Sequence, residues 1–207
     1  MILAIIQARM SSNRLPGKVL KEIAGKPMLR HVVDAARESK LVDMVTVATS
    51  GMGSDLPICE YCTDRGIAVH TGALDDVLDR FYKVALFYKP TYIVRLTADC
   101  PLLTGEVIDR VITAYLSSDL DYIRNAVDGY DVEVFHYEAL LTAAKLATEP
   151  EEREHVTKYF QNGKFDWIDC FIPDKVVGKY SVDTQEDFEK IRGVMESEGI
   201  RRSGVTA

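Results

Sequence analysis

The sequence has no long hydrophobic run, no internal repeat and no excess of basic residues. Its apolar runs fall far short of the roughly 20 residues of a membrane helix, and its first residues lack the charged region and cleavage site of a signal peptide. We therefore expect a cytoplasmic protein without a membrane partner. Its 25 Lys and Arg against 32 Asp and Glu give a net charge of -7, which argues against a general nucleic-acid binder. The 207 residues contain no linker, so we expect a single domain, residues 1–207.

Cysteine is scarce as well, with four residues in the chain. Cys59 and Cys62 form a CxxC pattern, which can mark a zinc or redox site. They fall in a predicted helix over residues 55–65, however, where positions i and i+3 share a face. No second pair has zinc spacing, and His70 is a lone candidate ligand. The pattern therefore favours two core-facing thiols over a metal or redox site.

The loop after the first predicted strand concentrates positive charge. Residues 2–6 (ILAII) are typical of a buried strand, and Ser-Ser-Asn and Pro-Gly turn signals follow them. Arg9, Arg14 and Lys18 lie in this loop among hydroxyl groups and backbone amides. Polyphosphates bind to such amides, Arg forks and Lys charges, and open α/β sheets bind ligands at the carboxyl ends of strands. The loop therefore favours phosphate binding over a merely solvated basic loop, although it is neither a Walker A nor a GxGxxG motif.

A second predicted strand end carries a carboxylate. Residues 93–96 (IVRL) are typical of a buried strand, and Asp99 follows just before the Pro101 turn. An acid there can cap the next helix, but Thr104 lies nearer to the expected start of that helix. Mg²⁺ usually takes one or two carboxylates together with substrate phosphates. Asp99 is therefore a candidate magnesium ligand that faces the cationic loop.

Apolar periodicity alternates between strand and helix along the chain. It predicts strands at 2–6, 42–49, 67–70, 93–96, 122–126, 130–135, 165–172 and 179–182, and helices at 26–39, 55–65, 75–88, 106–116, 137–147, 150–160 and 184–199. This order predicts a three-layer α/β fold whose sheet is mostly parallel, with a small antiparallel excursion at 122–135. The DxD at 119–121 precedes a strand instead of ending one, so we interpret it as a solvated turn. Residues 201–207 are expected to form a frayed tail.

Residues 7–20 (QARMSSNRLPGKVL) closely resemble the signature of cytidylyltransferases that activate sugars as CMP conjugates. The branch they resemble is that of the spore coat polysaccharide biosynthesis protein F, related to 3-deoxy-manno-octulosonate cytidylyltransferase and CMP-sialate synthetase. Further similar blocks are centred on residues 75–81, 99–103 and 182–188. The resemblance implies the Rossmann-like nucleotide-diphospho-sugar transferase fold, a Mg²⁺ cofactor and a homodimer. It also implies transfer of CMP from CTP to a sugar or sugar acid, with release of pyrophosphate.

The same resemblance implies roles for individual residues. The implied catalytic residues are Arg9, Arg14, Lys18, Asp99 and Asp183, and the implied metal ligands are Asp99 and Asp183. The implied nucleotide-binding residues are Ala8, Arg9, Ser11, Ser12, Arg14, Lys18, Asp76, Arg80 and Asp99. Asp76 could equally cap the helix that follows it. Thr184 and Asp187 fit a capping-box pattern, so Asp187 is expected to be structural.

The resemblance places the acceptor sugar near Asp131 and Glu133, and it implies that Arg153 and His155 bind the substrate or lie between the subunits of a dimer. Asp131 and Glu133 could instead form the wet face of an antiparallel strand pair, and His155 could be a packed helix residue. The segment before Asp131 is shorter than in the family, and Ala98 replaces a usual glycine. Two other functions therefore remain open. One is a non-catalytic relative that binds a nucleotide and assembles with other enzymes, and the other is a nucleotidyltransferase that uses a different nucleoside triphosphate.

Overall fold

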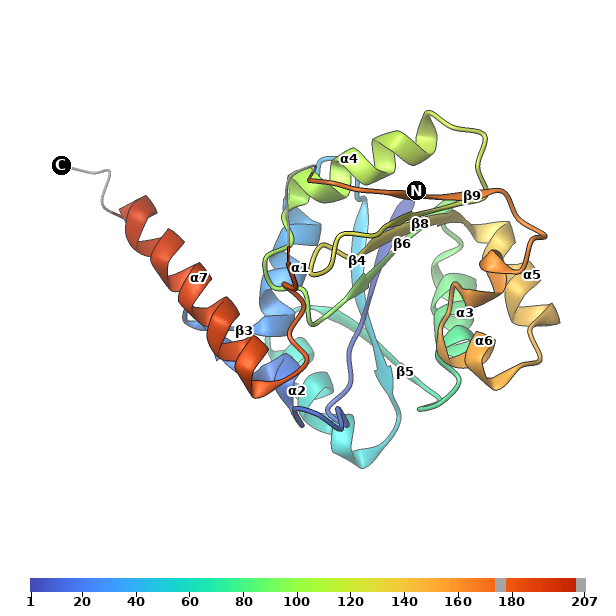
Figure 1. Cartoon of the computed structure of the whole chain (residues 1–207). Coiled ribbons are helices and arrows are strands. Elements are labelled where there is room, and N and C mark those ends of the chain that lie inside the picture. The colour runs from blue at the N-terminus through green and yellow to red at the C-terminus, as the bar shows by residue number, and fades with distance from the viewer. Residues whose placement is uncertain (174–177, 204–207) are drawn as a thin grey trace.

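A seven-stranded sheet with the order β5-β4-β1-β6-β8-β7-β9 forms the centre of the protein. Figure 1 shows it in a computed structural model that describes residues 1–173 and 178–203. The strands are β1 (Ile2–Gln7), β4 (Met44–Ser50), β5 (Ala68–Gly72), β6 (Tyr92–Thr97), β7 (Tyr122–Asn125), β8 (Val132–His136) and β9 (Trp167–Cys170). Strands β5, β4, β1 and β6 are parallel neighbours, so their carboxyl ends meet at one edge of the sheet.

Helices cover both faces of this sheet (Figure 1). One face carries α1 (Met28–Glu38), α2 (Leu56–Asp64) and α4 (Gly105–Leu116), and the other carries α3 (Val77–Tyr88), α5 (Tyr137–Leu146) and α6 (Pro150–Glu154). Because successive strand residues point to opposite faces, β1 serves both cores. Ala4 and Ile6 pack with the first group, and Leu3 and Ile5 pack with the second. This three-layer arrangement confirms the predicted fold class.

Strand β8 runs antiparallel to both of its neighbours, β6 and β7. The chain reaches it through the tight loop after β7, in which the Asn125 side-chain amide donates to the Tyr130 carbonyl. The exposed DxD at residues 119–121 precedes β7 in a turn, as predicted. The predicted antiparallel excursion is therefore present, on the side of the sheet away from β4 and β5.

Three predicted elements differ from the observed structure in where they begin or end, or in whether they form. The helix predicted over 150–160 breaks after Glu154, since His155 has the non-helical angles φ -106° and ψ 68°, and η3 (Lys158–Gln161) follows. Residues 179–182 are not a strand. Helix α7 (Gln185–Ser203) continues through part of the predicted tail, and the rest of that tail, 204–207, lies outside the described residues. Periodicity did not resolve these ends because tertiary contacts decide them.

A small satellite cluster joins the N-terminal loop to α7. The loop continues into η1 (Lys18–Leu20) and the two-stranded sheet of β2 (Glu22–Ile23) and β3 (Lys26–Pro27). Leu15 and Ile23 pack there against Val182, Phe188 and Ile191. The second half of α7 projects away from the sheet in Figure 1. No helix among the described residues is long and apolar enough to cross a membrane.

The two CxxC residues differ in burial. Cys62 is buried in the core beneath α1, and burial raises the pKa of its thiol to about 12. Cys59 is half-buried, one turn earlier on α2. No group of three or more His, Cys, Asp or Glu side chains in the described parts of the chain is arranged to hold a metal ion. Core packing, the interpretation that the sequence favoured, therefore explains the position of Cys62.

Candidate active site

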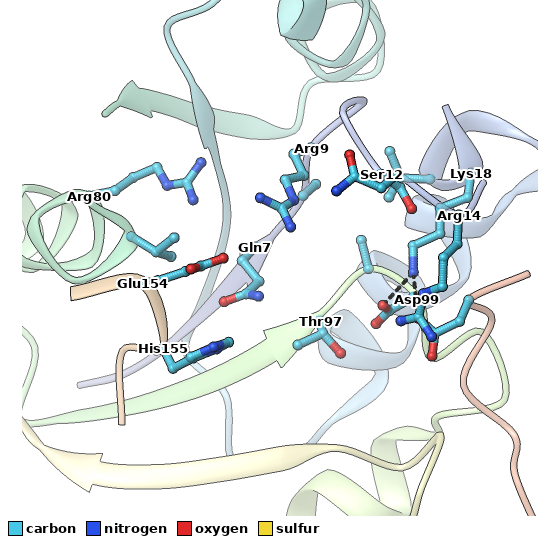
Figure 2. Close-up of a pocket in the computed structure, with 16 residues that line it drawn as sticks. Gln7, Arg9, Ser12, Arg14, Lys18, Arg80, Thr97, Asp99, Glu154 and His155 are labelled. Atoms are coloured by element: carbon cyan, nitrogen blue, oxygen red, sulfur yellow. Dashed lines mark hydrogen bonds and ion pairs between the residues drawn. The ribbon is translucent and has the colours of Figure 1, made fainter. Parts of the chain in front are cut away.

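A cleft of about 360 Å³ lies at the carboxyl ends of β1 and β6 (Figure 2). These parallel strands are paired up to Gln7 and Thr97, and the Ala98 amide donates to the Gln7 carbonyl at 3.1 Å. The loops that follow the two strands therefore start side by side. The lining residues are Gln7, Ala8, Arg9, Ser12, Asn13, Arg14, Lys18, Val19, Val77, Arg80, Thr97, Ala98, Asp99, Glu154, His155 and Asp183.

The Lys18 ammonium group bridges the two carboxylates that sequence analysis singled out. Its Nζ atom donates to Asp99 Oδ2 at 2.8 Å and to Asp183 Oδ1 at 3.2 Å. It also donates to the Val182 carbonyl at 2.7 Å, and its side chain is 10% exposed. The acids lie far apart in sequence, yet both are within hydrogen-bonding distance of one cation. The expected convergence of Asp99, Asp183 and the N-terminal loop is therefore present.

Asp183 has two further cationic partners. Arg14 Nη2 lies 2.9 Å from its Oδ1 atom, and Lys179 Nζ lies 3.1 Å from its Oδ2 atom. Partial burial of Asp183 acts to raise its pKa, but Lys179 and Lys18 outweigh burial and hold the pKa below its usual value. Asp183 is therefore a stable anion at the end of the cleft nearest α7.

A backbone contact and a helix cap hold the Asp183 segment in place. The Val182 amide donates to the Asp99 carbonyl at 2.9 Å, so the segment is anchored beside the β6 loop without being a strand. Asp187 accepts from the amides of Asp183 and Thr184, and its own amide donates to Thr184 Oγ1. This reciprocal cap starts α7, which agrees with the structural role predicted for Asp187.

A buried aspartate that sequence analysis did not single out shapes the cationic loop. Asp55 is 0% exposed and accepts from the Met10 amide at 2.7 Å, as well as from Thr49 and Ser50 at the end of β4. The amides of Ser12, Leu15 and Gly17 are also used inside the loop. Within residues 9–17 of the described structure, the amides of Arg9, Ser11, Asn13 and Arg14 have no hydrogen-bond partner. These amides of the loop are therefore free for a ligand.

The other half of the cleft contains a different set of side chains. Figure 2 shows Arg80, Glu154 and His155 on the side away from Lys18 and Asp99, with Arg9 and Gln7 between the two halves. Arg80 is 3% exposed, and its burial lowers the pKa of the guanidinium. The Gln7 side-chain oxygen accepts from Arg95 Nε at 3.1 Å. The cleft is therefore cationic and acidic at one end, and at the other it is bordered by arginines and by Glu154, which has no hydrogen bond or ion pair with the described part of the chain.

Two predicted ligand-binding residues pair with each other behind the cleft. Asp76 caps α3 by accepting from the Asp79 amide at 2.8 Å, and its other oxygen accepts from Arg153 Nε at 3.0 Å and from Nη2 at 2.5 Å. Arg153 also donates to the Ala144 carbonyl at the end of α5. This ion pair ties α6 to α3 and α5, and neither residue lines the cleft. Asp76 therefore has the helix-capping role, which the sequence left open as the alternative to nucleotide binding.

The two acids of the β7–β8 region are buried in polar contacts. Glu133 Oε2 lies 2.8 Å from Arg95 Nη1, on the strand beside it. Asp131 accepts from the Cys100 thiol at 3.1 Å and from the Gly129 amide at 3.1 Å, and its burial raises its pKa. Neither acid is on a wet face and neither lines the cleft, so they are not placed to contact a ligand there.

Most of the predicted site residues lie together. The cleft contains Ala8, Arg9, Ser12, Arg14, Lys18, Arg80, Asp99, His155 and Asp183, whereas Ser11, Asp76, Asp131, Glu133 and Arg153 are not among its lining residues. Sequence analysis missed Gln7, Thr97 and Glu154. Gln7 and Thr97 end the two strands at the cleft, so strand ends alone could have identified them. Glu154 carried no such signal, because a regular helix was predicted there.

The carboxylates at the Lys18 end fit a magnesium ion in donor chemistry and number. Asp99 Oδ2 and Asp183 Oδ1 both contact one cation, the Lys18 ammonium group, and carboxylate oxygens are the ligands that Mg²⁺ prefers. Two such ligands suffice when a substrate supplies phosphate oxygens.

Comparison with known proteins agrees with this geometry. The model of the family described as "Cytidylyltransferase" matches residues 3–201. The chain belongs to the cytidylyltransferase family. The resemblance noted in residues 7–20 is thereby confirmed, and with it the assignment to the nucleotidyltransferases.

Individual cytidylyltransferases and their relatives are similar over nearly the whole chain. The spore coat polysaccharide biosynthesis protein SpsF of Bacillus subtilis (strain 168) is 36% identical over 212 residues, which cover 97% of this chain and 88% of that protein. The structure of a cytidylyltransferase from Leptospira borgpetersenii has a TM-score of 0.88 at 28% identity and covers 95% of this chain and 87% of that one. CMP:2-keto-3-deoxy-manno-octonic acid synthetase complexed with CTP shares the fold, with a TM-score of 0.75 at 19% identity over 95% of this chain and 99% of that one.

Proposed function

We propose that this protein is a Mg²⁺-dependent cytidylyltransferase that transfers CMP from CTP to a hydroxyl group of a sugar or sugar acid and releases pyrophosphate. The acceptor oxygen forms a bond to the α-phosphorus, the bond from that phosphorus to the bridging oxygen breaks, and pyrophosphate leaves with that electron pair, while the hydroxyl proton is released to solvent. The observation that carries the proposal is the Lys18 ammonium group at the end of the cationic loop, which lies between Asp99 and Asp183.

The Lys18 end of the cleft suits the triphosphate. Arg9 and Arg14 lie on the loop whose amides at Ser11, Asn13 and Arg14 are free to donate. Amides in a turn, arginine forks and a lysine charge would hold the β- and γ-phosphates and stabilise pyrophosphate as it leaves. Transfers of this kind depend mainly on positioning and on charge stabilisation, so the cleft needs no obvious general base.

Asp99 and Asp183 would hold the magnesium ion. When bound, Mg²⁺ neutralises phosphate charge and polarises the phosphate that is attacked. Lys18 already contacts both carboxylates, so it would keep them from repelling each other before the substrate binds. Arg14 and Lys179 hold Asp183 from two further directions and fix its orientation.

The descriptions of the relatives support the acceptor class that we propose. SpsF is described as a spore coat polysaccharide biosynthesis protein, and the structurally similar synthetase forms a CMP-linked sugar acid. A sugar or sugar acid that is used for a surface polysaccharide fits both descriptions. His155 lines the cleft in the same half as Arg80 and Glu154, and we assign it the predicted contact with the acceptor.

The test is pyrophosphate release by the purified full chain with Mg²⁺. Each of CTP, UTP, GTP and ATP is combined with a panel of sugars and sugar acids. We expect release that requires CTP, Mg²⁺ and an acceptor, together with a CMP-sugar product detected by mass spectrometry. Turnover with another nucleotide instead of CTP would favour the alternative nucleotidyltransferase. Binding of CTP without turnover on any acceptor would favour the non-catalytic relative.

A further inference from the structure

Gln7 ends β1 inside the cleft, and one half of its side-chain amide is already engaged. Its Oε1 atom accepts from Arg95 Nε at 3.1 Å. An arginine side chain can only donate hydrogen bonds, so this contact fixes which way round the amide lies. The amide nitrogen takes part in none of the hydrogen bonds within the described residues, and the side chain lines the cleft. Gln7 therefore presents an uncharged donor to a ligand.

Arg95 is in turn held by a buried ion pair. Arg95 and Glu133 lie opposite each other on β6 and β8, with Arg95 Nη1 2.8 Å from Glu133 Oε2. Their side chains are 13% and 10% exposed, and neither residue lines the cleft. Burial acts to lower the pKa of the guanidinium, but Glu133 outweighs burial and raises the pKa above its usual value. Arg95 is therefore a permanent cation, and Glu133 neutralises it behind Gln7.

The guanidinium of Arg95 makes both contacts because its donors are fixed in a fork. Nε donates to Gln7 on β1, and Nη1 lies against Glu133 on β8. A lysine has a single nitrogen at its end and could not keep both contacts in these positions. A buried ion pair contributes little to stability compared with apolar packing of the same volume. The row of Glu133, Arg95 and Gln7 is therefore better explained by the amide that it orients in the cleft than by the stability of the sheet.

Gln7 points to the face of the sheet on which His155 borders the cleft. Leu3 and Ile5 pack in the core beneath α3 and α5, and side chains two residues apart on a strand share a face. His155 directly follows α6, which lies on that same face. Figure 2 shows Gln7 in the centre of the cleft, with His155 on the side away from Lys18. The charged donors that suit a triphosphate lie at the Lys18 end, whereas an uncharged donor here suits an uncharged oxygen, such as a sugar hydroxyl.

We propose that Gln7 donates from its side-chain amide to a hydroxyl oxygen of the acceptor sugar, and that Arg95 and Glu133 are positioning residues that hold this amide in place. The inference rests on the proposed function, because it assumes that a sugar binds beside the triphosphate. It gives Glu133 an indirect role, through Arg95, in place of direct contact with the sugar.

Two-substrate kinetics and equilibrium binding of CTP, both with Mg²⁺, test the role of Gln7. The acceptor used is the member of the panel of sugars and sugar acids that the unmodified protein converts fastest. Gln7→Glu keeps the size of the side chain and the Arg95 contact but replaces the donor by an oxygen, and Gln7→Met removes the donor without adding charge. In both variants the KM of the acceptor should rise by about three- to tenfold, the value of one hydrogen bond. The kcat should change by less than about twofold, since the contact exists before and during the reaction. The Kd of CTP should stay unchanged in Gln7→Met.

Glu133→Gln tests the positioning role, because a glutamine can still accept from Arg95 but cannot neutralise it. Its acceptor KM should rise while the Kd of CTP stays unchanged. If Glu133 acts through Gln7, adding Glu133→Gln to Gln7→Met should cause no further loss. Arg95→Lys, which keeps the charge and loses the fork, gives the same test if Glu133→Gln does not fold. Asp34→Asn is the matched control, since Asp34 also pairs with an arginine and is 20% exposed but lies outside the cleft.

An unchanged acceptor KM in Gln7→Glu would overturn the inference. So would a loss of CTP binding in Gln7→Met as large as the rise in acceptor KM, because it would place the amide at the nucleotide. Losses that add up in the double variant would show that Glu133 only stabilises the sheet and would overturn its positioning role. If the unmodified protein converts no acceptor, the proposed function fails, and this inference fails with it. If it converts an acceptor and the Gln7 variants keep its KM, only this inference fails.

Discussion

At the level of single residues, Lys18 is the side chain in the cleft whose contacts join several parts of the chain. One ammonium group satisfies two carboxylates and a backbone carbonyl, and each contact fixes a different part of the chain. An arginine would not fit this role equally well, because its planar fork cannot direct three donors around one atom. A substitution of Lys18 by arginine, which keeps only the positive charge, would therefore not preserve the site.

We predict that Lys18→Ala lowers kcat/KM for CTP by about 10²–10³, the usual cost of removing one preorganised charge-stabilising donor. Lys26→Ala is the matched control, since Lys26 also contacts an aspartate at 2.8 Å but is exposed and outside the cleft. Steady-state kinetics with pyrophosphate detection measures both. Circular dichroism verifies the fold of each variant. Near-full activity of folded Lys18→Ala would contradict the role given to this residue.

At the level of elements, the start of α7 controls where Asp183 lies. Asp187 accepts from the Lys179 ammonium group at 2.7 Å and from two backbone amides, and these contacts outweigh its burial and lower its pKa to about 2. A carboxylate with a depressed pKa stabilises the folded state above its unfolded pKa of about 3.9. That stabilisation is lost as the pH falls through the folded-state pKa.

Asp187→Asn should therefore be less stable than the unmodified protein at neutral pH, and the difference should shrink between about pH 4 and pH 2. Urea unfolding at a series of pH values measures it. Asp166→Asn serves as a control, because its carboxylate takes part in none of the described hydrogen bonds or ion pairs. A difference in the free energy of unfolding that stays constant down to pH 2 would contradict the capping role.

The same elements show what the sequence can predict. Strands β1 and β6 followed from apolar runs that stop at turn signals, and the loops after them placed Lys18 and Asp99 beside the cleft, although Gln7 and Thr97 at the strand ends were missed. Periodicity could not locate the break at His155, because the Asp76–Arg153 contact that anchors it joins residues far apart in sequence. For the same reason Asp55 escaped notice, since its partners on β4 and in the cationic loop are known only once the fold is formed.

At the scale of the whole molecule, the cleft differs in charge from the rest of the surface. The protein carries a net charge of -7, yet Arg9, Arg14, Lys18 and Arg80 all line one cleft. Asp99, Asp183 and Glu154 offset part of that charge. A polyanion is therefore repelled by the molecule at large and attracted locally, which favours binding at a single place.

This contrast predicts that nucleotide binding weakens with salt. Raising NaCl from 50 mM to 500 mM should reduce CTP affinity by roughly three- to tenfold, since the Debye length falls from above 10 Å to below 8 Å. Arg14→Ala should show a smaller dependence, because the Arg14 side chain is 63% exposed and its charge is therefore readily screened by salt. Isothermal titration calorimetry at several salt concentrations gives both slopes. Identical slopes for the two proteins would contradict a contribution from Arg14.

The contacts of Val182 have a consequence for how the protein is made. Its amide binds the loop after β6, and its carbonyl binds the lysine that follows β1, so the main chain of a late segment completes a site begun by the first residues. Ribosomes deliver the chain from its N-terminus, and early parts can fold before late ones emerge. A nascent chain with the whole parallel sheet in place would still lack a finished catalytic centre. The cleft thus becomes complete only after the segment around Val182 has been synthesised.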